Sequence, residues 1–148
     1  MCSLQREHIC LPKGKKPANV MFVFDRESED NAQLESIVIR QLNYELKYDW
    51  YKTYAIKCRY EGKITSDILN NCRKWLKFEI KAVKPYLIVL FGKASIYAVL
   101  GTKYKRLRVG VMYNGNHRYF IADSLSAGEE SAMNSVQKIL SFIREFYQ

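Results

Sequence analysis

Two nearly continuous runs of apolar residues place the strongest constraint on how this chain can fold. Residues 19–25 read NVMFVFD, and residues 86–92 read YLIVLFG. A strand with one face toward water alternates apolar and polar side chains, whereas a strand covered on both faces does not. Both runs are therefore predicted to be strands inside a sheet that has helices on each side.

Segments with helical periodicity follow these strands. Apolar residues recur three and four positions apart from Leu34 to Leu42, as on one face of a helix. Thr65 is a suitable N-cap for a second helix, and Pro85 ends it. The predicted buried face of this second helix consists of Ile68, Leu69, Cys72, Trp75, Leu76, Ile80 and Val83.

The rest of the chain continues the alternation of strands and helices. The remaining predicted elements are a strand at 53–58, a short helix at 93–101, a hairpin at 108–123 with Asn114 and Gly115 at its turn, and a helix at 129–147. This order predicts an α/β fold, a three-layer α/β/α sandwich with a mainly parallel central sheet. We expect one domain over residues 1–148, in which residues 1–18 form an N-terminal arm.

The charge of the chain favours a polyanionic partner. Its formal net charge is +9 over 148 residues, and nucleic acid is the commonest partner of such basic domains. No apolar run approaches the roughly 20 residues of a membrane span, and the N-terminus lacks the apolar core of a signal peptide. We expect a cytoplasmic protein that binds DNA and no membrane. Its compactness would also suit a viral accessory protein.

Basic residues gather at two places where phosphates could bind. The segment 103–108 reads KYKRLR, which combines cations with a tyrosine that could stack on a base. Lys93 and Ser95 begin a predicted helix, whose N-terminus favours anions. A solvated basic loop is the alternative interpretation of 103–108. The candidate DNA contacts are Arg59, Lys93, Ser95, Lys103, Lys105, Arg106 and Arg108.

The chain has four cysteines, at positions 2, 10, 58 and 72. In a reducing compartment they are more typical of thiols or metal ligands than of disulfides. Four thiolates would suit zinc or an iron–sulfur cluster. Spacing alone favours the other interpretation, in which Cys72 is a small core residue, because there is no CxxC pair and no tandem metal knuckle.

Cys58 and Cys72 belong to a longer series of short motifs. The series consists of Lys57-Cys58-Arg59, Cys72-Arg73 with Leu76, Lys84-Pro85, and Phe91-Gly92 with Ala94. It resembles the family 4 uracil-DNA glycosylases, which are the iron–sulfur type. In that family, a strand leads to Lys-Cys-Arg, a helix carries Cys-Arg-x-x-Leu, and Lys-Pro precedes an apolar strand and Leu-Gly-x-x-Ala. The resemblance covers roughly residues 10 to 101.

The resemblance implies a uracil-DNA glycosylase-like fold and a 4Fe–4S cluster. Its ligands would be Cys2, Cys10, Cys58 and Cys72, with zinc as the alternative metal. One departure concerns the N-terminal pair. The family has a CxxC there, whereas seven residues separate Cys2 from Cys10 in this chain. An arm can absorb that difference, and Cys2 is the ligand most affected by it.

The motifs that handle the base in the family are altered in this chain. The family's first strand leads into Gly-Glu-x-Pro-Gly, but Phe24 and Asp25 begin a turn without glycine or proline. The asparagine that reads uracil is replaced by Tyr54, which cannot offer an amide's donor and acceptor. The nearest match to the family's His-Pro-Ser is Ala122-Asp123-Ser124, and the charge of Asp123 would oppose that of a departing uracil. We interpret Phe24, Asp25, Tyr54 and Asp123 as a degenerate base pocket.

Three functional hypotheses follow from these observations. The first is a DNA-binding or adaptor protein that holds a 4Fe–4S cluster, lacks canonical uracil excision and acts with replication, repair or transcription machinery. The second is a divergent DNA glycosylase that excises uracil or another base, using Asp25 or Glu27. The third is a cluster-bearing protein–protein interaction module that does not contact DNA.

Overall fold

The computed structural model describes residues 12–46, 49–57, 62–101 and 107–146. Its elements, in chain order, are β1 (Lys13–Gly14), β2 (Val20–Phe24), α1 (Glu29–Leu46), β3 (Trp50–Tyr54), α2 (Ser66–Val83), β4 (Leu87–Phe91), α3 (Lys93–Leu100), β5 (Met112–Asn114), β6 (Arg118–Ala122), the 3₁₀ helix η2 (Leu125–Ala127) and α4 (Glu129–Phe146). None of the described helices is both long and apolar enough to cross a membrane.

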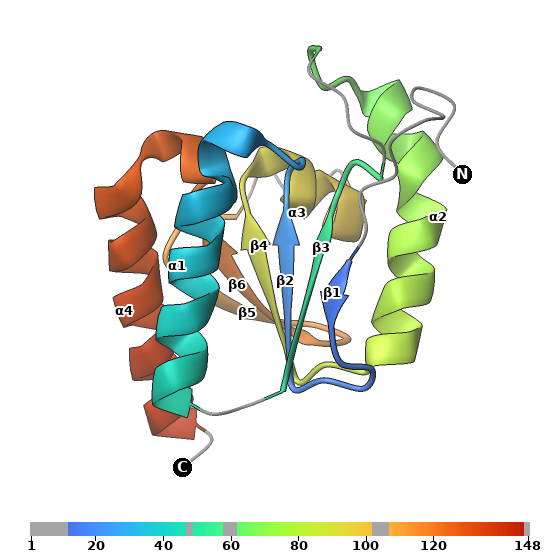
Figure 1. Cartoon of the computed structure of the whole chain (residues 1–148). Helices are drawn as coiled ribbons and strands as arrows, with labels where there is room; N and C mark the ends of the chain where they lie inside the picture. The colour runs from blue at the N-terminus through green and yellow to red at the C-terminus, as the bar shows by residue number, and fades with distance from the viewer. Residues whose placement is uncertain (1–11, 47–48, 58–61, 102–106, 147–148) are drawn as a thin grey trace.

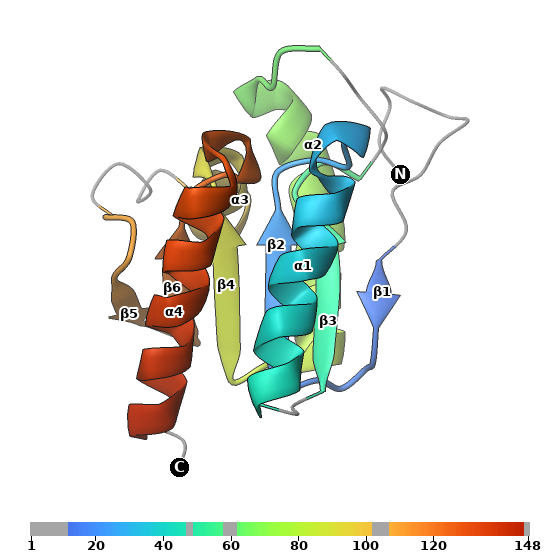
Figure 2. The same ribbon diagram turned by 60° about the vertical axis from the view of Figure 1, so that its left-hand side comes forward.

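The strands form one mixed sheet in the order β1-β3-β2-β4-β6-β5. The four inner strands are parallel, and the edge strands β1 and β5 pair antiparallel with their neighbours. Helices α1 and α4 pack together on one face of the sheet, and α2 and α3 cover the other face (Figures 1 and 2). The predicted α/β/α arrangement with a mainly parallel sheet is confirmed.

The two apolar runs are the central strands β2 and β4, and every residue in them is buried. Their side chains alternate between the two faces of the sheet. Phe22, Phe24 and Phe91 pack in the core beneath α1 and α4. Met21 and Leu90 pack in the core beneath α2 and α3. This double coverage explains why neither run alternates with polar residues.

Two strands differ from the sequence-based prediction. The strand predicted at 53–58 occupies Trp50–Tyr54 instead, because these residues pair with Val20–Phe24. Lys52 interrupted the apolar pattern, but its charge is paired with Glu35. Strand β1 lies within the predicted N-terminal arm, and its two residues are too few to give a periodicity. Gly14 has φ +124°, and a Cβ there would lie 2.2 Å from the Trp50 carbonyl oxygen.

Helix α2 begins and ends as predicted, although one residue of its predicted buried face is exposed. The Thr65 side chain accepts a hydrogen bond from the Ile68 amide, and Lys84 closes the helix in the left-handed conformation. Cys72 and Leu76 are fully buried. Trp75 is 38% exposed, so its assignment to the buried face was wrong. By helical spacing, Trp75 lies only at the border of that face.

Candidate functional site

The carboxyl ends of the parallel strands border two adjoining hollows. All four inner strands point toward this edge of the sheet (Figure 1). The first, here the α1 hollow, has a volume of about 500 Å³ and includes Arg26, Asp30, Glu35 and Leu125 in its lining. The second, the α3 hollow, has a volume of about 540 Å³ and includes Thr65, Lys93, Tyr97 and Asp123. Asp25, Ile64, Ser124 and Ser126 line both hollows.

The size and place of the two hollows suit a ligand site. Small-molecule sites generally have volumes of about 300–1,000 Å³. Open α/β sheets bind ligands at the carboxyl ends of their strands. Residues that follow β2, β4 and β6 meet there, because Asp25, Lys93 and Asp123 share the lining of the α3 hollow.

Asp25 connects the end of β2 to the beginning of α3. Its Oδ1 accepts hydrogen bonds from the Ser95 amide at 3.1 Å and from the Ser95 hydroxyl at 3.0 Å. Gly92 leaves room for this carboxylate, since a Cβ on Gly92 would lie 2.4 Å from Asp25 Oδ2. Asp25 thus supplies the cap that Gly92 cannot, and it occupies the positive end of the helix dipole.

The same geometry takes the Asp25 carboxylate largely out of water. Burial raises the pKa of the Asp25 carboxyl, and the hydrogen bonds from Ser95 and Ser124 only partly offset this effect. Carboxyl groups that act as general acids or bases commonly lie in a hollow and have a raised pKa. Asp25 is therefore the strongest candidate for acid–base chemistry at this edge of the sheet.

The variant Asp25→Asn is expected to gain stability relative to the wild type as pH rises. Because the folded-state pKa of Asp25 is raised, the unfolded chain loses this proton at a lower pH than the folded protein. The wild type therefore loses stability as pH rises from the ordinary range of aspartate through the raised folded-state pKa, whereas asparagine does not ionise. Urea unfolding of both proteins across that range measures the difference. If the difference in unfolding free energy between variant and wild type stays constant with pH, or changes in the opposite direction, Asp25 is not desolvated in the folded protein.

Tyr54 belongs to a buried polar cluster beneath the α1 hollow. Its hydroxyl donates to Glu35 Oε1 at 2.7 Å, and Lys52 Nζ forms an ion pair with the same oxygen. Its ring packs on that of Phe24, with centroids 6.2 Å apart, and Phe24 stacks on Phe91 at 4.6 Å. Tyr54 lines neither hollow, so it lies outside the pocket in which the resemblance placed it.

The loop after β6 brings Asp123 and two serines to the α3 hollow. Asp123 Oδ2 accepts a hydrogen bond from the Ser131 hydroxyl at 3.0 Å, which ties the loop to α4. Ser124 caps η2 by accepting from the Ser126 amide. The segment that corresponds to the family's His-Pro-Ser therefore presents the Asp123 carboxylate to the hollow and no imidazole.

Three of the predicted DNA contacts lie in the described part of the chain. Lys93 is exposed at the α3 hollow, and Arg108 is exposed with its amide bound to the Tyr113 hydroxyl at 2.9 Å. Ser95 is fully buried, and its amide and hydroxyl are hydrogen-bonded to Asp25, so a phosphate has no access to it in this conformation. Arg59, Lys103, Lys105 and Arg106 lie outside the described residues.

Of the four predicted cluster ligands, Cys72 alone lies within the described residues, while Cys2, Cys10 and Cys58 lie outside them. Cys72 is fully buried on α2, which fits a core residue and also a ligand in a site closed to water. Lys57 pairs with Glu79, which shares a face of α2 with Cys72 two turns away. This pair places residue 57 beside the helix face that carries Cys72. Within the described residues, no three His, Cys, Asp or Glu side chains gather to hold a metal ion.

Other residues of the family resemblance have structural roles in this protein. Arg73 Nε donates to the Ala98 carbonyl at 3.0 Å, and its guanidinium lies over the Tyr97 ring, 5.6 Å from the centroid. These contacts join α2 to α3. Lys84 provides the left-handed end of α2, and buried Pro85 leads into β4. The shared residues thus support the arrangement of α2, β4 and α3 around the α3 hollow.

Two charged residues of the α1 hollow were not identified from the sequence. Glu35 is 3% exposed and lies at helical spacing with Val38 and Leu42 on the buried face of α1. A carboxylate at such a position is a signal that could have revealed it. Arg26 donates to the Gly62 carbonyl at 2.7 Å, a contact across 36 residues that no local pattern indicates.

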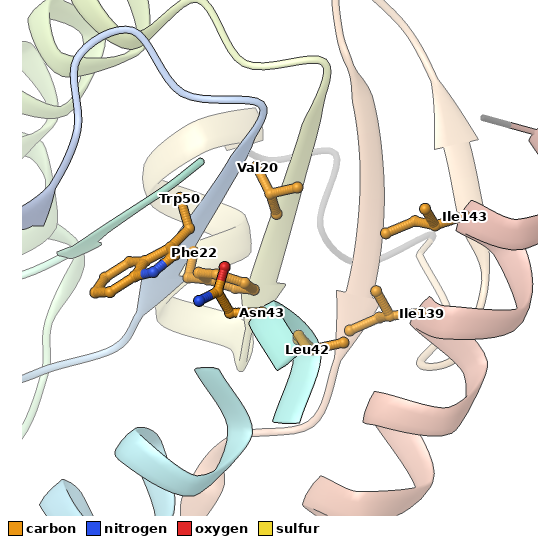
Figure 3. Close-up of a pocket in the computed structure, with 7 residues that line it drawn as sticks. All are labelled: Val20, Phe22, Leu42, Asn43, Trp50, Ile139 and Ile143. Atoms are coloured by element: carbon orange, nitrogen blue, oxygen red, sulfur yellow. The ribbon is translucent and has the colours of Figure 1, made fainter. Parts of the chain in front are cut away.

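A third hollow lies at the opposite edge of the sheet and is apolar. Figure 3 shows its lining by Val20, Phe22, Leu42, Asn43, Trp50, Ile139 and Ile143. Its volume is about 10 Å³, which is about the space of one water molecule. It is a small gap in the packing between α1 and α4, and it carries no chemistry.

The fold and the hollows define an α/β protein with a ligand site at the carboxyl ends of its parallel strands. Comparison with family models identifies its class more closely. Residues 9–140 match the model described as the uracil DNA glycosylase superfamily, and the chain belongs to that superfamily. A search of curated proteins found no match.

Proposed function

We propose that this protein is a DNA-binding or adaptor member of the uracil-DNA glycosylase superfamily that does not carry out canonical uracil excision. It would hold a 4Fe–4S cluster and act with replication, repair or transcription machinery. The observation that carries the proposal is the chemistry of the α1 hollow. Among the described residues, its lining contains the carboxylates Asp25, Asp30 and Glu35, of which Glu35 is paired with Lys52, and the one cation Arg26.

This lining suits neither recognition nor release of uracil. Excision leaves negative charge on the departing base, and nearby carboxylates raise the energy of that state. Tyr54 lies beneath the α1 hollow and does not line it; it cannot present the paired donor and acceptor of an amide, and its hydroxyl is already bonded to Glu35. A flipped uracil would therefore lack both the recognition and the electrostatic stabilisation that the family pattern provides.

The proposal of DNA binding rests on superfamily membership and on charge. Superfamily members usually bind DNA, and the chain carries a net charge of +9. Lys93 at the α3 hollow and Arg108 before β5 are both exposed. The basic residues Arg59, Lys103, Lys105 and Arg106 would add to this surface. Ser95 is omitted from the proposed contacts because it is buried beneath Asp25.

The proposed cluster rests on the resemblance and on the surroundings of Cys72. The thiol of Cys72 is buried, and the Lys57–Glu79 pair holds the residue before Cys58 beside the same face of α2. Cys2, Cys10 and Cys58 complete the proposed ligand set. The cluster would have a structural role, joining the N-terminal arm to the loop before α2.

Asp25 favours a second candidate function, that of a divergent DNA glycosylase. Its raised pKa and its place in the lining of both hollows are what a base that activates water would need. Its two hydrogen bonds from Ser95 favour the structural role instead, because they hold Oδ1 against α3. We therefore rank excision of another base behind a non-enzymatic role.

DNA binding is expected to weaken when Lys93 and Arg108 are both replaced by glutamate. The salt dependence of duplex binding is the slope of log K against log salt concentration, which is negative. Removing two phosphate contacts should reduce the magnitude of this slope by about 1.8. Fluorescence anisotropy with a labelled duplex over a range of salt concentrations measures this slope. The matched control is Arg40→Glu with Arg144→Glu, which makes the same charge change on the exposed faces of α1 and α4. Equal loss in both variants, or no duplex binding at low salt, would contradict the proposed contacts.

A further inference from the structure

The outer face of α2 carries two exposed aromatic side chains that the proposed function does not use. Trp75 is 38% exposed and Phe78 is 65% exposed. Their ring centroids are 6.4 Å apart, with an angle of 38° between the planes. Solvent-exposed aromatic pairs are costly to leave in water, and they commonly mark a binding surface.

Three lysines accompany the aromatic pair. Lys74, Lys77 and Lys81 are all exposed, and they follow one another at intervals of three and four residues along α2. At about 1.5 Å per residue, they form a row roughly 10 Å long. Lys74 Nζ lies 5.4 Å from the centroid of the Trp75 ring. Cations and ring faces are therefore presented side by side.

No carboxylate in the described part of the chain pairs with this row of lysines. Helix α2 contains two acidic residues, Asp67 in its first turn and Glu79. Glu79 faces the sheet, where it pairs with Lys57 and accepts a hydrogen bond from the Tyr51 hydroxyl at 2.6 Å. Among the described residues, Lys74, Lys77 and Lys81 form no ion pair. The outer face of α2 is thus positive and aromatic from residue 74 to residue 81.

We propose that this α2 surface, formed by Lys74, Trp75, Lys77, Phe78 and Lys81, binds single-stranded nucleic acid. Lysines neutralise the phosphates, and Trp75 and Phe78 provide rings on which unpaired bases stack. A duplex would satisfy the lysines but would keep its bases away from the rings. Lysine is depleted at protein–protein interfaces, so the three lysines favour a nucleic acid over a protein partner. This inference goes beyond the proposed function, which concerns a different surface.

The test uses the full chain and a fluorescein-labelled oligothymidine of about 20 nucleotides, which contains no uracil. Phe78→Ala is expected to weaken binding about tenfold, the loss of one stacked base. Lys77→Glu with Lys81→Glu should lower the salt slope by about 1.4, as expected for two phosphates of a single strand. Binding should also quench the fluorescence of Trp75, and this quenching should vanish in Trp75→Phe.

Matched controls lie on other helices. Tyr44, exposed on α1, serves as the aromatic control through Tyr44→Ala, and Arg40→Glu with Arg144→Glu serves as the charge control. Both controls should retain the affinity of the wild type. Circular dichroism and urea unfolding establish that each variant is folded. Phe78 is exposed enough that its replacement should leave the fold intact.

Two results would overturn the inference. In the first, the α2 variants bind oligothymidine as tightly as the wild type does. If Lys93→Glu with Arg108→Glu still weakens duplex binding, the proposed function stands and only the α2 inference fails. In the second, the wild type binds poly-glutamate but not oligothymidine, and the α2 variants do not bind poly-glutamate. That result would assign the surface to acidic polypeptides.

Discussion

Replacing Glu35 with alanine is expected to lower the free energy of unfolding by about 3–5 kcal/mol. The substitution removes the acceptor of both Tyr54 and Lys52 and leaves a buried ammonium group without a counter-charge. The side chain of Lys52 is 13% exposed, so water can compensate only in part. Urea unfolding of wild type and variant measures the loss. A loss below about 1 kcal/mol would show that this cluster does not hold Tyr54 in place.

A double variant separates the charge pair from the packing of α1. Glu35→Ala with Lys52→Met removes both charges, and it should be more stable than Glu35→Ala alone. Tyr54→Phe keeps the ring on Phe24 and removes only the hydroxyl, so it should cost about 1 kcal/mol. If the double variant is no more stable than the single one, the destabilisation comes from lost packing instead of an uncompensated lysine.

Replacing Cys72 with alanine is expected to remove the proposed cluster. The wild type purified without oxygen should be brown and contain about four iron atoms per chain. Cys72→Ala should lose most of this iron and its visible absorption, because the cluster would lack one of its four thiolates. Iron analysis and absorbance spectra measure the loss, and Cys58→Ala should behave in the same way.

The core interpretation of Cys72 predicts a different outcome. A small buried thiol replaced by alanine costs roughly 1 kcal/mol of stability. Metal content would then be the same in Cys72→Ala and in the wild type. A colourless wild type, whether free of metal or loaded with zinc, would also contradict the iron–sulfur proposal.

Periodicity predicted most of the fold because the central strands are covered on both faces. The runs 19–25 and 86–92 became β2 and β4, and Thr65 caps α2 as expected. The start of β3 was missed because Lys52 interrupts its apolar pattern. Its charge is balanced by Glu35 from α1, and such a partner cannot be recognised within one strand.

The sequence predicted where the candidate site lies more accurately than how it is built. Asp25 and Asp123, which the resemblance assigned to the base pocket, both line the α3 hollow at the carboxyl ends of the parallel strands, where open sheets bind ligands. The bond from Ser95 to Asp25 spans 70 residues and replaces the phosphate contact expected of Ser95. The Glu35–Tyr54 bond depends on the packing of α1 against β3. Neither contact follows from local spacing.

The central claim is that this member of the superfamily binds DNA without excising uracil, and a single assay tests it most directly. A duplex with one uracil opposite guanine is incubated with excess protein, heated in alkali and resolved on a denaturing gel, with an active uracil glycosylase as the positive control. We predict an intact strand on this gel, and a bound complex on a native gel of the same incubation run before the alkali, because carboxylates line the α1 hollow and Tyr54 replaces the reading amide. A cleaved strand that disappears in Asp25→Asn would contradict the claim and establish Asp25 as the catalytic base.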